Sequence, residues 1–171
     1  MSLLIRKAVG TDAETISNLG KKAFTHAFGY LLSDISLRKY LNKVYGTEKI
    51  AESLAKKSNT FWIAELENTT VAFLKMKWNF GLNKKASETE ANLQHLYVNP
   101  DFTGQRIGET ILKRALEETK ERKTNKLWLE VFPEGPDSLR FFIKQGFAVH
   151  GKYLHPFDDF ELEYDVLVKH L

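Results

Sequence analysis

The chain reads LQHLYVNPDFTGQRIGE from Leu93 to Glu109, and this stretch decides the fold. It begins as a strand that ends at Val98. Two glycines, Gly104 and Gly108, then precede apolar residues that recur at helical spacing. The backbone N–H groups of such a turn converge, and the helix start adds positive dipole charge. We therefore predict a site for an anion such as a pyrophosphate, although an ordinary tight turn between a strand and a helix would use glycines as readily.

The N-terminal half of the chain predicts helices followed by a hairpin. Ile16, Leu19 and Phe24 recur at helical spacing after a match to a capping box at Thr11-Asp12-Ala13-Glu14. Aromatic and branched residues further along predict two hairpin strands. The predicted elements are a strand at 3–8, helices at 11–29, 36–45 and 47–57, hairpin strands at 60–66 and 71–78, and a polar surface loop at 79–90.

The C-terminal half alternates strands and helices. Ile111, Leu112 and Leu116 form the apolar face of a helix after the glycine turn, and Gly146 marks the end of a shorter helix. The predicted elements are strands at 92–98 and 126–132, helices at 109–123 and 137–144, and a last pair of strands at 147–154 and 161–169. This order predicts a mixed α/β fold. No linker or internal repeat divides it, so we expect one domain over residues 1–171.

Composition excludes several classes of protein. The 171 residues are 43% hydrophobic and 27% charged, which is typical of a globular chain rather than a disordered one. Cysteine is absent, which excludes disulfides, thiolate metal sites and a cysteine nucleophile. No run approaches the roughly 18 apolar residues of a membrane-spanning helix, and the N-terminus lacks the order of a signal peptide. We therefore expect a soluble, cytoplasmic protein without a membrane partner.

The charge of the chain disfavours nucleic acid as a partner. Lys and Arg together number 25 and Asp and Glu 22, so the formal net charge is +3, and the basic residues are scattered among acids. The histidines outside the central strand, His26, His150, His155 and His170, show no spacing typical of metal ligands. We expect neither nucleic acid nor a metal ion to bind.

The quoted stretch resembles the acyl-CoA signature of the GNAT N-acetyltransferases. The matching residues are Val98-x-Pro100-x-Phe102-x-Gly104-x-x-Ile107-Gly108, followed by Ile111-Leu112. A later Phe141-Phe142-x-x-x-Gly146-Phe147 resembles a second motif of that family. More weakly, the long helical N-terminal half is similar to bacterial spermidine/spermine N-acetyltransferases. The resemblance implies a GNAT-like α/β fold, with a mixed, mostly antiparallel central sheet flanked by helices and a strand splay at the acyl-CoA site.

The resemblance also implies an activity. The implied enzyme moves the acetyl group of acetyl-CoA directly to the primary amine of a small acceptor, and polyamines are among the candidate acceptors. The resemblance also allows a homodimer. In this family the main chain at the end of the central strand binds the pantetheine arm and thioester, and the amides of the glycine turn bind the pyrophosphate. The residues that this implies for acetyl-CoA are Leu96, Tyr97, Val98, Thr103, Gly104, Gln105, Arg106, Ile107, Gly108, Glu109 and Phe142.

Several positions depart from the family pattern. Arg106 replaces the usual middle glycine, and its side chain either crowds the phosphates or reaches a phosphate oxygen. Phe142 stands where a tyrosine often protonates the departing thiolate, and a phenyl ring donates no proton. Gly135 takes the place of a frequent asparagine, and Gln94 lies where a glutamate base is common. These departures leave open an alternative function, a catalytically weak domain that binds or senses acyl-CoA.

The central strand supplies the candidate catalytic residues. His95 is a candidate general base, since its unperturbed pKa is about 6.5; a histidine held by hydrogen bonds on a sheet face is the alternative. Strand alternation puts His95 and Tyr97 on one face. Tyr97 and Tyr153 are candidate acids for the thiolate, and water or direct return of the amine proton are equal alternatives.

Other polar and aromatic residues suit either a site or an ordinary fold. Asn92 and Glu130 either line the slot between strands or face solvent. The acidic stretch Asp158-Asp159, with Glu161 and Glu163, suits a polycation or is a solvated loop. The aromatic residues of the N-terminal helices, which either cover an acceptor groove or belong to the core, are Phe24, Phe28, Tyr30, Tyr40 and Tyr45.

Overall fold

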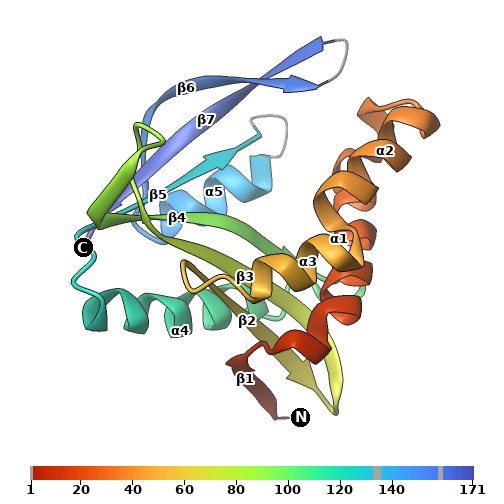
Figure 1. Cartoon of the computed structure of the whole chain (residues 1–171), viewed down its shortest axis with the longest axis horizontal. Helices are drawn as coiled ribbons and strands as arrows, with labels where there is room; N and C mark the ends of the chain where they lie inside the picture. The colour runs from red at the N-terminus through yellow and green to blue at the C-terminus, as the bar shows by residue number, and fades with distance from the viewer. Residues whose placement is uncertain (1, 133–135, 158–159) are drawn as a thin grey trace. The chain divides into compact units, whose positions relative to one another are not determined.

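A computed structural model of the chain describes residues 2–132, 136–157 and 160–171 (Figure 1). Helices and strands follow one another in the order that the sequence predicts. The elements are β1 (Leu3–Lys7), η1 (Gly10–Asp12), α1 (Ala13–Phe28), η2 (Gly29–Leu31), α2 (Asp34–Tyr45), α3 (Thr47–Leu54), β2 (Asn59–Leu66), β3 (Thr69–Phe80), β4 (Ala86–Val98), η3 (Pro100–Phe102), α4 (Ile107–Glu121), β5 (Lys126–Val131), α5 (Pro136–Lys144), β6 (Ala148–Phe157) and β7 (Phe160–His170).

The strands form a seven-stranded sheet in the order β1-β2-β3-β4-β5-β7-β6. The pairs β1–β2, β5–β7 and β6–β7 are antiparallel, whereas β4 and β5 are parallel. The β2–β3 hairpin turns at Glu67 and Asn68, whose positive φ angles of 47° and 66° suit the right-handed twist of paired strands. A mixed, mostly antiparallel sheet flanked by helices confirms the predicted fold class.

The chain divides into two compact units. The first comprises Met1–Met76 with His95–Glu118, and the second comprises Lys77–Gln94 with Thr119–Leu171. In the first unit, apolar residues of α1, α2 and α3 form one core cluster with residues of β2 and β3, and Ile16 lies at its centre with none of its surface exposed. Hydrophobic burial of this kind is the main force that holds α1–α3 on the sheet.

Residues 107–118 of α4 belong to the first unit, and the apolar face of the helix fixes them there. Ile111, Leu112 and Ala115 have no exposed surface, and Ile107 at the helix start is 3% exposed. The spacing of these residues matches the helical periodicity read from the sequence. The first turn of α4 is therefore anchored where the glycine turn ends.

The start of α1 differs from the predicted capping box at Thr11-Asp12-Ala13-Glu14. Asp12 instead accepts two hydrogen bonds from the Arg6 guanidinium, both 2.9 Å, and one from the Val9 N–H at 2.7 Å. These hydrogen bonds, with Arg6 contributing most, lower the pKa of the Asp12 carboxyl below its ordinary value. The carboxylate thus joins β1 to the start of the helix, because bidentate pairing with arginine outcompetes local capping.

In the second unit, residues 79–90 extend the sheet rather than forming the predicted loop. The strand β3 continues to Phe80, and β4 starts at Ala86. The carboxylate of Glu90 holds the short turn between them, accepting hydrogen bonds from the Leu82 N–H at 2.7 Å and the Lys126 ammonium at 3.0 Å. Residues 86–90 are exposed or half-buried, so they lack the apolar alternation that identifies a strand in sequence.

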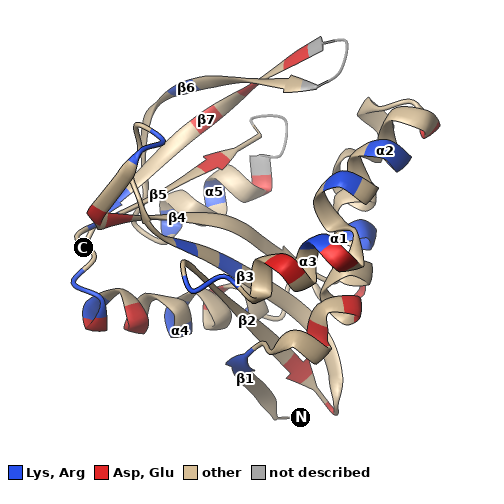
Figure 2. Cartoon of the chain, in the orientation of Figure 1, with Lys and Arg blue, Asp and Glu red and all other residues tan. Residues whose placement is uncertain are grey.

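Charged residues of both signs are interspersed along the helices and strands of each unit (Figure 2). On α4, for example, Arg114 and Glu117 form an exposed ion pair at 2.9 Å. Within residues 2–132, 136–157 and 160–171, no helix combines the length and the apolar composition that crossing a membrane requires.

Candidate active site

The strand β4 ends in a turn that is held by its own residues. The side chain of Asn99 accepts a hydrogen bond from the Asp101 N–H at 3.2 Å, and its carbonyl accepts one from the Phe102 N–H at 2.8 Å. The Thr103 hydroxyl donates to the carbonyl of Pro100 at 3.2 Å. These bonds fix the direction in which the chain leaves the sheet before the glycine turn.

The glycine turn bends through two residues in the left-handed region. Gly104 has φ 79° and Arg106 has φ 59°. For arginine this conformation costs about 1 kcal/mol, whereas glycine adopts it freely. Residues 103–106 are exposed, and Ile107 is the buried anchor that follows them.

The turn presents free hydrogen-bond donors. No group within the described part of the chain accepts a hydrogen bond from the backbone N–H groups of residues 104–109. The guanidinium of Arg106 likewise has no partner there. Glu109 lies in the first turn of α4, where a carboxylate complements the helix dipole. Unpaired N–H groups at a helix start, next to a free guanidinium, can bind a phosphate or pyrophosphate.

Leu96, Tyr97 and Val98 lie at the end of β4, directly before this turn, and each is half-buried. Their contact with the coenzyme, which the family resemblance implies, stays a prediction.

An aromatic cluster surrounds the face of β4 that carries His95 and Tyr97. Ring centroids lie 5.5 Å apart for Tyr45 and His95, 5.7 Å for Phe73 and Tyr97, and 5.9 Å for His95 and Tyr97. The shared face confirms the strand alternation. The members of this aromatic cluster are Phe24, Tyr40, Tyr45, Phe73, His95 and Tyr97.

Two of the aromatic residues of the N-terminal helices belong to the core, and a role of the others in covering an acceptor groove stays a prediction. Phe24 and Tyr45 are core residues, with 3% and 1% of their surface exposed, whereas Tyr30 is 70% exposed. Tyr45 reaches β4 because Gly20 makes room for its ring: a Cβ at Gly20 would lie 2.6 Å from Cδ1 of Tyr45. The Ser17 hydroxyl also donates a hydrogen bond to the carbonyl of Tyr45. Two residues of α1 therefore position this tyrosine.

Tyr97 forms a hydrogen bond with Tyr45. The hydroxyl of Tyr45 donates a hydrogen bond to the hydroxyl oxygen of Tyr97 at 3.0 Å, so the proton of Tyr97 stays available for a different acceptor. Burial raises the pKa of Tyr97 above its ordinary value of 10, and the hydrogen bond from Tyr45 opposes that rise. Tyr97 is therefore protonated at neutral pH, and Tyr45 stabilises the phenolate that proton donation would leave.

His95 is a neutral imidazole among these rings. Burial, and after it the positive charge of Lys75, lowers the pKa of His95 from 6.5 to about 3. Within the described part of the chain no group forms a hydrogen bond with the imidazole. His95 thus keeps a free lone pair at physiological pH, but it is a much weaker base than an exposed histidine.

In the second unit, the parallel pairing of β4 with β5 is short. The paired residues run from Glu90 with Lys126 to Asn92 with Trp128, although both strands continue beyond this last pair. Asn92 is buried, with 6% exposed, and its side-chain amide donates a hydrogen bond to the carbonyl of Trp128 at 3.0 Å. A side chain therefore joins the strands where their backbone pairing ends, and the splay at the acyl-CoA site that the resemblance implies stays a prediction. Asn92 does not face solvent.

Phe142, which the resemblance implies for coenzyme binding, lies in α5 of the second unit. It is 8% exposed, and its ring centroid lies 5.0 Å from that of Phe141 and 5.5 Å from that of Phe147. This packing makes Phe142 part of the core of that unit. Its contact with the coenzyme stays a prediction.

The remaining candidate residues of the second unit form contacts with other side chains of that unit. Glu130 accepts a hydrogen bond from Lys84, whose ammonium also lies over the ring of Tyr153. In the acidic stretch, Glu163 pairs with Lys152 at 2.6 Å. Three residues discussed in the sequence, Gly135, Asp158 and Asp159, lie outside the described residues. The described residues include no cluster of three or more histidines and acids that could hold a metal ion.

The sequence does not predict two side-chain contacts, that of Tyr45 with Tyr97 and that of Lys84 with Glu130. The sequence offers Tyr45 only as one of several helical aromatics, and nothing in it shows that its hydroxyl meets Tyr97. Lys84 lies in a stretch that the sequence presents as a polar loop, so its contacts with Glu130 and Tyr153 have no sequence signal beyond the Gly81 and Asn83 of a turn.

The pattern of these elements matches a family of known proteins. Residues 19–147 match the model of the acetyltransferase (GNAT) family. The chain belongs to the GNAT acetyltransferase family. The matched segment contains β4, the glycine turn, α4 and α5, so it includes both motifs that carry the resemblance in sequence.

Two relatives named as acetyltransferases match most of this GNAT chain. It is 24% identical over 153 residues to a spermidine N(1)-acetyltransferase of Thermoplasma acidophilum, a match that covers 87% of this chain and 90% of that protein. It is 19% identical over 151 residues to an uncharacterized N-acetyltransferase of Lactobacillus delbrueckii subsp. lactis, covering 88% and 87%.

Solved structures share the fold at low identity. The PaiA N-acetyltransferase from Thermoplasma acidophilum, in complex with coenzyme A, superposes with a TM-score of 0.84 at 22% identity over 100% of both chains. The ribosomal-protein-S18-alanine N-acetyltransferase from Escherichia coli superposes with a TM-score of 0.72 at 18% identity over 99% and 94% of the two chains. Family and relatives together identify this GNAT protein as an N-acetyltransferase.

Proposed function

We propose that this N-acetyltransferase uses acetyl-CoA and transfers the acetyl group directly to the primary amine of a small acceptor, with polyamines as the acceptor class. The observation that carries the proposal is the turn at residues 104–109, which is exposed over residues 104–106 and whose backbone N–H groups have no acceptor within the described residues. These donors lie at the start of α4, so they suit the pyrophosphate of a coenzyme.

Arg106 adds a positive charge to this turn. Its backbone is left-handed, its side chain is exposed, and its guanidinium has no partner among the described residues. A free guanidinium next to an anion-binding turn can form a bidentate contact with phosphate oxygens. We therefore assign Arg106 to phosphate binding rather than to crowding of the site.

Tyr97 supplies the proton that the reaction requires. When the amine nitrogen attacks the acetyl carbon and the carbon–sulfur bond breaks, the leaving thiolate takes a proton. In many family members a tyrosine at the position of Phe142 gives it, and a phenyl ring cannot. The Tyr97 hydroxyl has a free proton, and the hydrogen bond from Tyr45 at 3.0 Å stabilises the phenolate until water reprotonates it.

His95 orients the amine. With a pKa of about 3 it does not hold a proton at neutral pH, but its free lone pair accepts a hydrogen bond from the attacking nitrogen. The amine proton that is lost after attack passes to water. Since a primary alkylammonium has a pKa of about 10.4, the fraction of neutral acceptor rises with pH in the physiological range.

The acceptor class rests on the relatives. The spermidine N(1)-acetyltransferase of Thermoplasma acidophilum matches over 87% of this chain, which supports a polyamine as the acceptor. At 24% identity the choice among amines is decided by experiment.

The test is a coenzyme A thiol-release assay with spermidine, spermine, an aminoglycoside, an amino acid and a peptide with a free N-terminus. We expect turnover with the polyamines. Calorimetry with acetyl-CoA separates the alternative of a domain that binds acyl-CoA without catalysis: binding without turnover across the panel would favour that alternative. Absence of binding would contradict both.

A further inference from the structure

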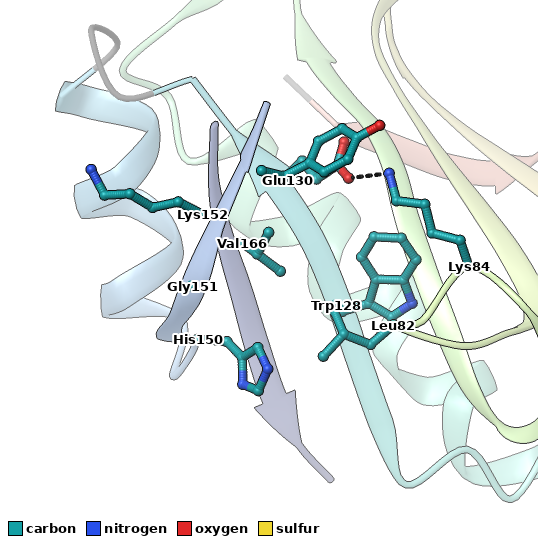
Figure 3. Close-up of a pocket in the computed structure, with 9 residues that line it drawn as sticks. Leu82, Lys84, Trp128, Glu130, His150, Gly151, Lys152 and Val166 are labelled. Carbon is teal, nitrogen blue, oxygen red and sulfur yellow. Dashed lines mark hydrogen bonds and ion pairs between the residues drawn. The ribbon is translucent and has the colours of Figure 1, made fainter. Parts of the chain in front are cut away.

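The second unit contains a cavity of about 200 Å³ that the proposed transfer chemistry does not use (Figure 3). Its walls come from the β3–β4 turn, β5, β6 and β7. Two aromatic rings, Trp128 and Tyr153, and one carboxylate, Glu130, line it. Among the residues that line the cavity, Glu130 is the single acid.

Lys84 places its ammonium in this cavity. The Nζ atom lies 2.8 Å from Oε1 of Glu130 and 3.6 Å from the ring centroid of Tyr153. Figure 3 shows the side chain of Lys84 directed at Glu130, with the indole of Trp128 beside it. A carboxylate and the face of an aromatic ring are the groups that proteins use to bind alkylammonium ions.

The turn that carries Lys84 is held without the help of its side chain. The Lys84 N–H donates to the carbonyl of Gly81 at 2.8 Å, and the Gly81 N–H donates to the carbonyl of Lys85 at 2.7 Å. The Lys85 N–H donates to the side chain of Asn83 at 2.9 Å, and Glu90 accepts from the Leu82 N–H. The backbone therefore stays in place when the Lys84 side chain moves out.

The contacts of Lys84 are of the kind that a competing cation can replace. The side chain of Lys84 is 43% exposed, whereas that of Glu130 is 23% exposed, so the carboxylate is the more enclosed partner. Exposed ion pairs and cation–π contacts are individually weak. Lys152, the other lysine of the cavity lining, pairs with Glu163 at 2.6 Å, and its side chain points away from Glu130 in Figure 3.

We propose that this cavity is a binding site for an alkylammonium group, and that Lys84 occupies it as an internal competitor until such a group arrives. The inference rests on the proposed function, because a polyamine carries ammonium groups besides the one that is acetylated. Glu130 supplies the charge, Tyr153 supplies the aromatic face, and Lys84 sets the affinity by competing for both.

The test is calorimetry with spermidine in the absence of coenzyme, on the full chain. Lys84→Met removes the competing ammonium but keeps an unbranched side chain at the same backbone position, where φ is 62°. We expect Lys84→Met to bind spermidine about fivefold more tightly than the wild type, since a weak internal contact no longer has to be displaced. Glu130→Gln should bind severalfold more weakly.

Lys152→Met is the matched control, because it removes the same charge from the same lining without touching Glu130. We expect it to change spermidine affinity less than twofold. Equal tightening in Lys84→Met and Lys152→Met would show a general charge effect and overturn the proposal. Unchanged or weaker binding by Lys84→Met would overturn it as well.

A second measurement on the wild type covers the case in which Lys84→Met does not fold. The ring of Tyr153 should shift the ε-methylene NMR signal of Lys84 upfield, and saturating spermidine should return it to the position of an exposed lysine. A signal that stays shifted at saturation contradicts the proposal. Neither measurement uses acetyl-CoA, so both remain informative even if the protein transfers no acetyl group. If the protein acetylates spermidine but Lys84 does not affect spermidine binding, this inference is refuted and the proposed function is not.

Discussion

Acid should destabilise this protein through His95. In the unfolded chain His95 takes up a proton below about pH 6.5, whereas in the folded protein it stays neutral until about pH 3. Between these limits only the unfolded state gains the proton, so the free energy of unfolding falls as the pH falls. At about 1.36 kcal/mol per pH unit, the loss between pH 6.5 and pH 5 is about 2 kcal/mol.

The variant that isolates this effect is His95→Phe, which keeps a planar ring among Tyr45, Phe73 and Tyr97. Urea unfolding followed by tryptophan fluorescence, at about pH 7 and about pH 5, gives the free energy of unfolding for the wild type and the variant. We expect the variant to lose about 2 kcal/mol less than the wild type between the two pH values. His26→Gln, on an exposed position of α1, is the control and should keep the wild-type loss.

An equal loss in His95→Phe and the wild type would refute the reasoning, because it would mean that His95 takes up its proton in the folded protein as readily as in the unfolded chain. In that case His95 would be an ordinary solvent-accessible base, and its assignment as a neutral partner of the amine would be wrong.

Three further predictions concern the proposed site. Tyr97→Phe should lower kcat about 100-fold and leave the KM for acetyl-CoA nearly unchanged. Tyr45→Phe should lower kcat less, and the double variant should have the same kcat as Tyr97→Phe. Full activity of Tyr97→Phe would rule out Tyr97 as the acid. Arg106→Gly should weaken coenzyme A binding about tenfold in calorimetry and make it less sensitive to salt, whereas equal or tighter binding would mean that the side chain crowds the turn. Asn92→Leu should lower the free energy of unfolding by about 2 kcal/mol, as measured with urea, because it removes a buried hydrogen bond to the carbonyl of Trp128; a change within error would contradict a role in joining β4 and β5.

The sequence predicts the order of elements because its signals there are local. The glycine turn, the apolar face of α4 and the alternation of His95 with Tyr97 each depend on neighbours in the chain, and the structure contains all three. The family motif covers the same residues, so the fold and the glycine turn can both be predicted from the sequence, whereas anion binding by the turn stays a prediction.

The parts that sequence reasoning misses depend on residues far apart in the chain. Residues 11–14 match a capping box in sequence, but Asp12 pairs with the Arg6 guanidinium of β1 in the structure. Residues 86–90 form a strand through backbone pairing and the contacts of Glu90, although their polar side chains show no alternation. The pKa of His95 depends on the rings packed around it and on Lys75, and no local pattern encodes either.

The left-handed arginine at position 106 has a consequence for how the turn holds its shape. A glycine would adopt this left-handed backbone freely, whereas arginine holds it at a cost of about 1 kcal/mol. The rest of the fold, with the buried Ile107 directly after the turn, must offset that cost. The stability of the whole fold and the shape of this short exposed segment are therefore coupled, so variants that destabilise the protein should also loosen the segment.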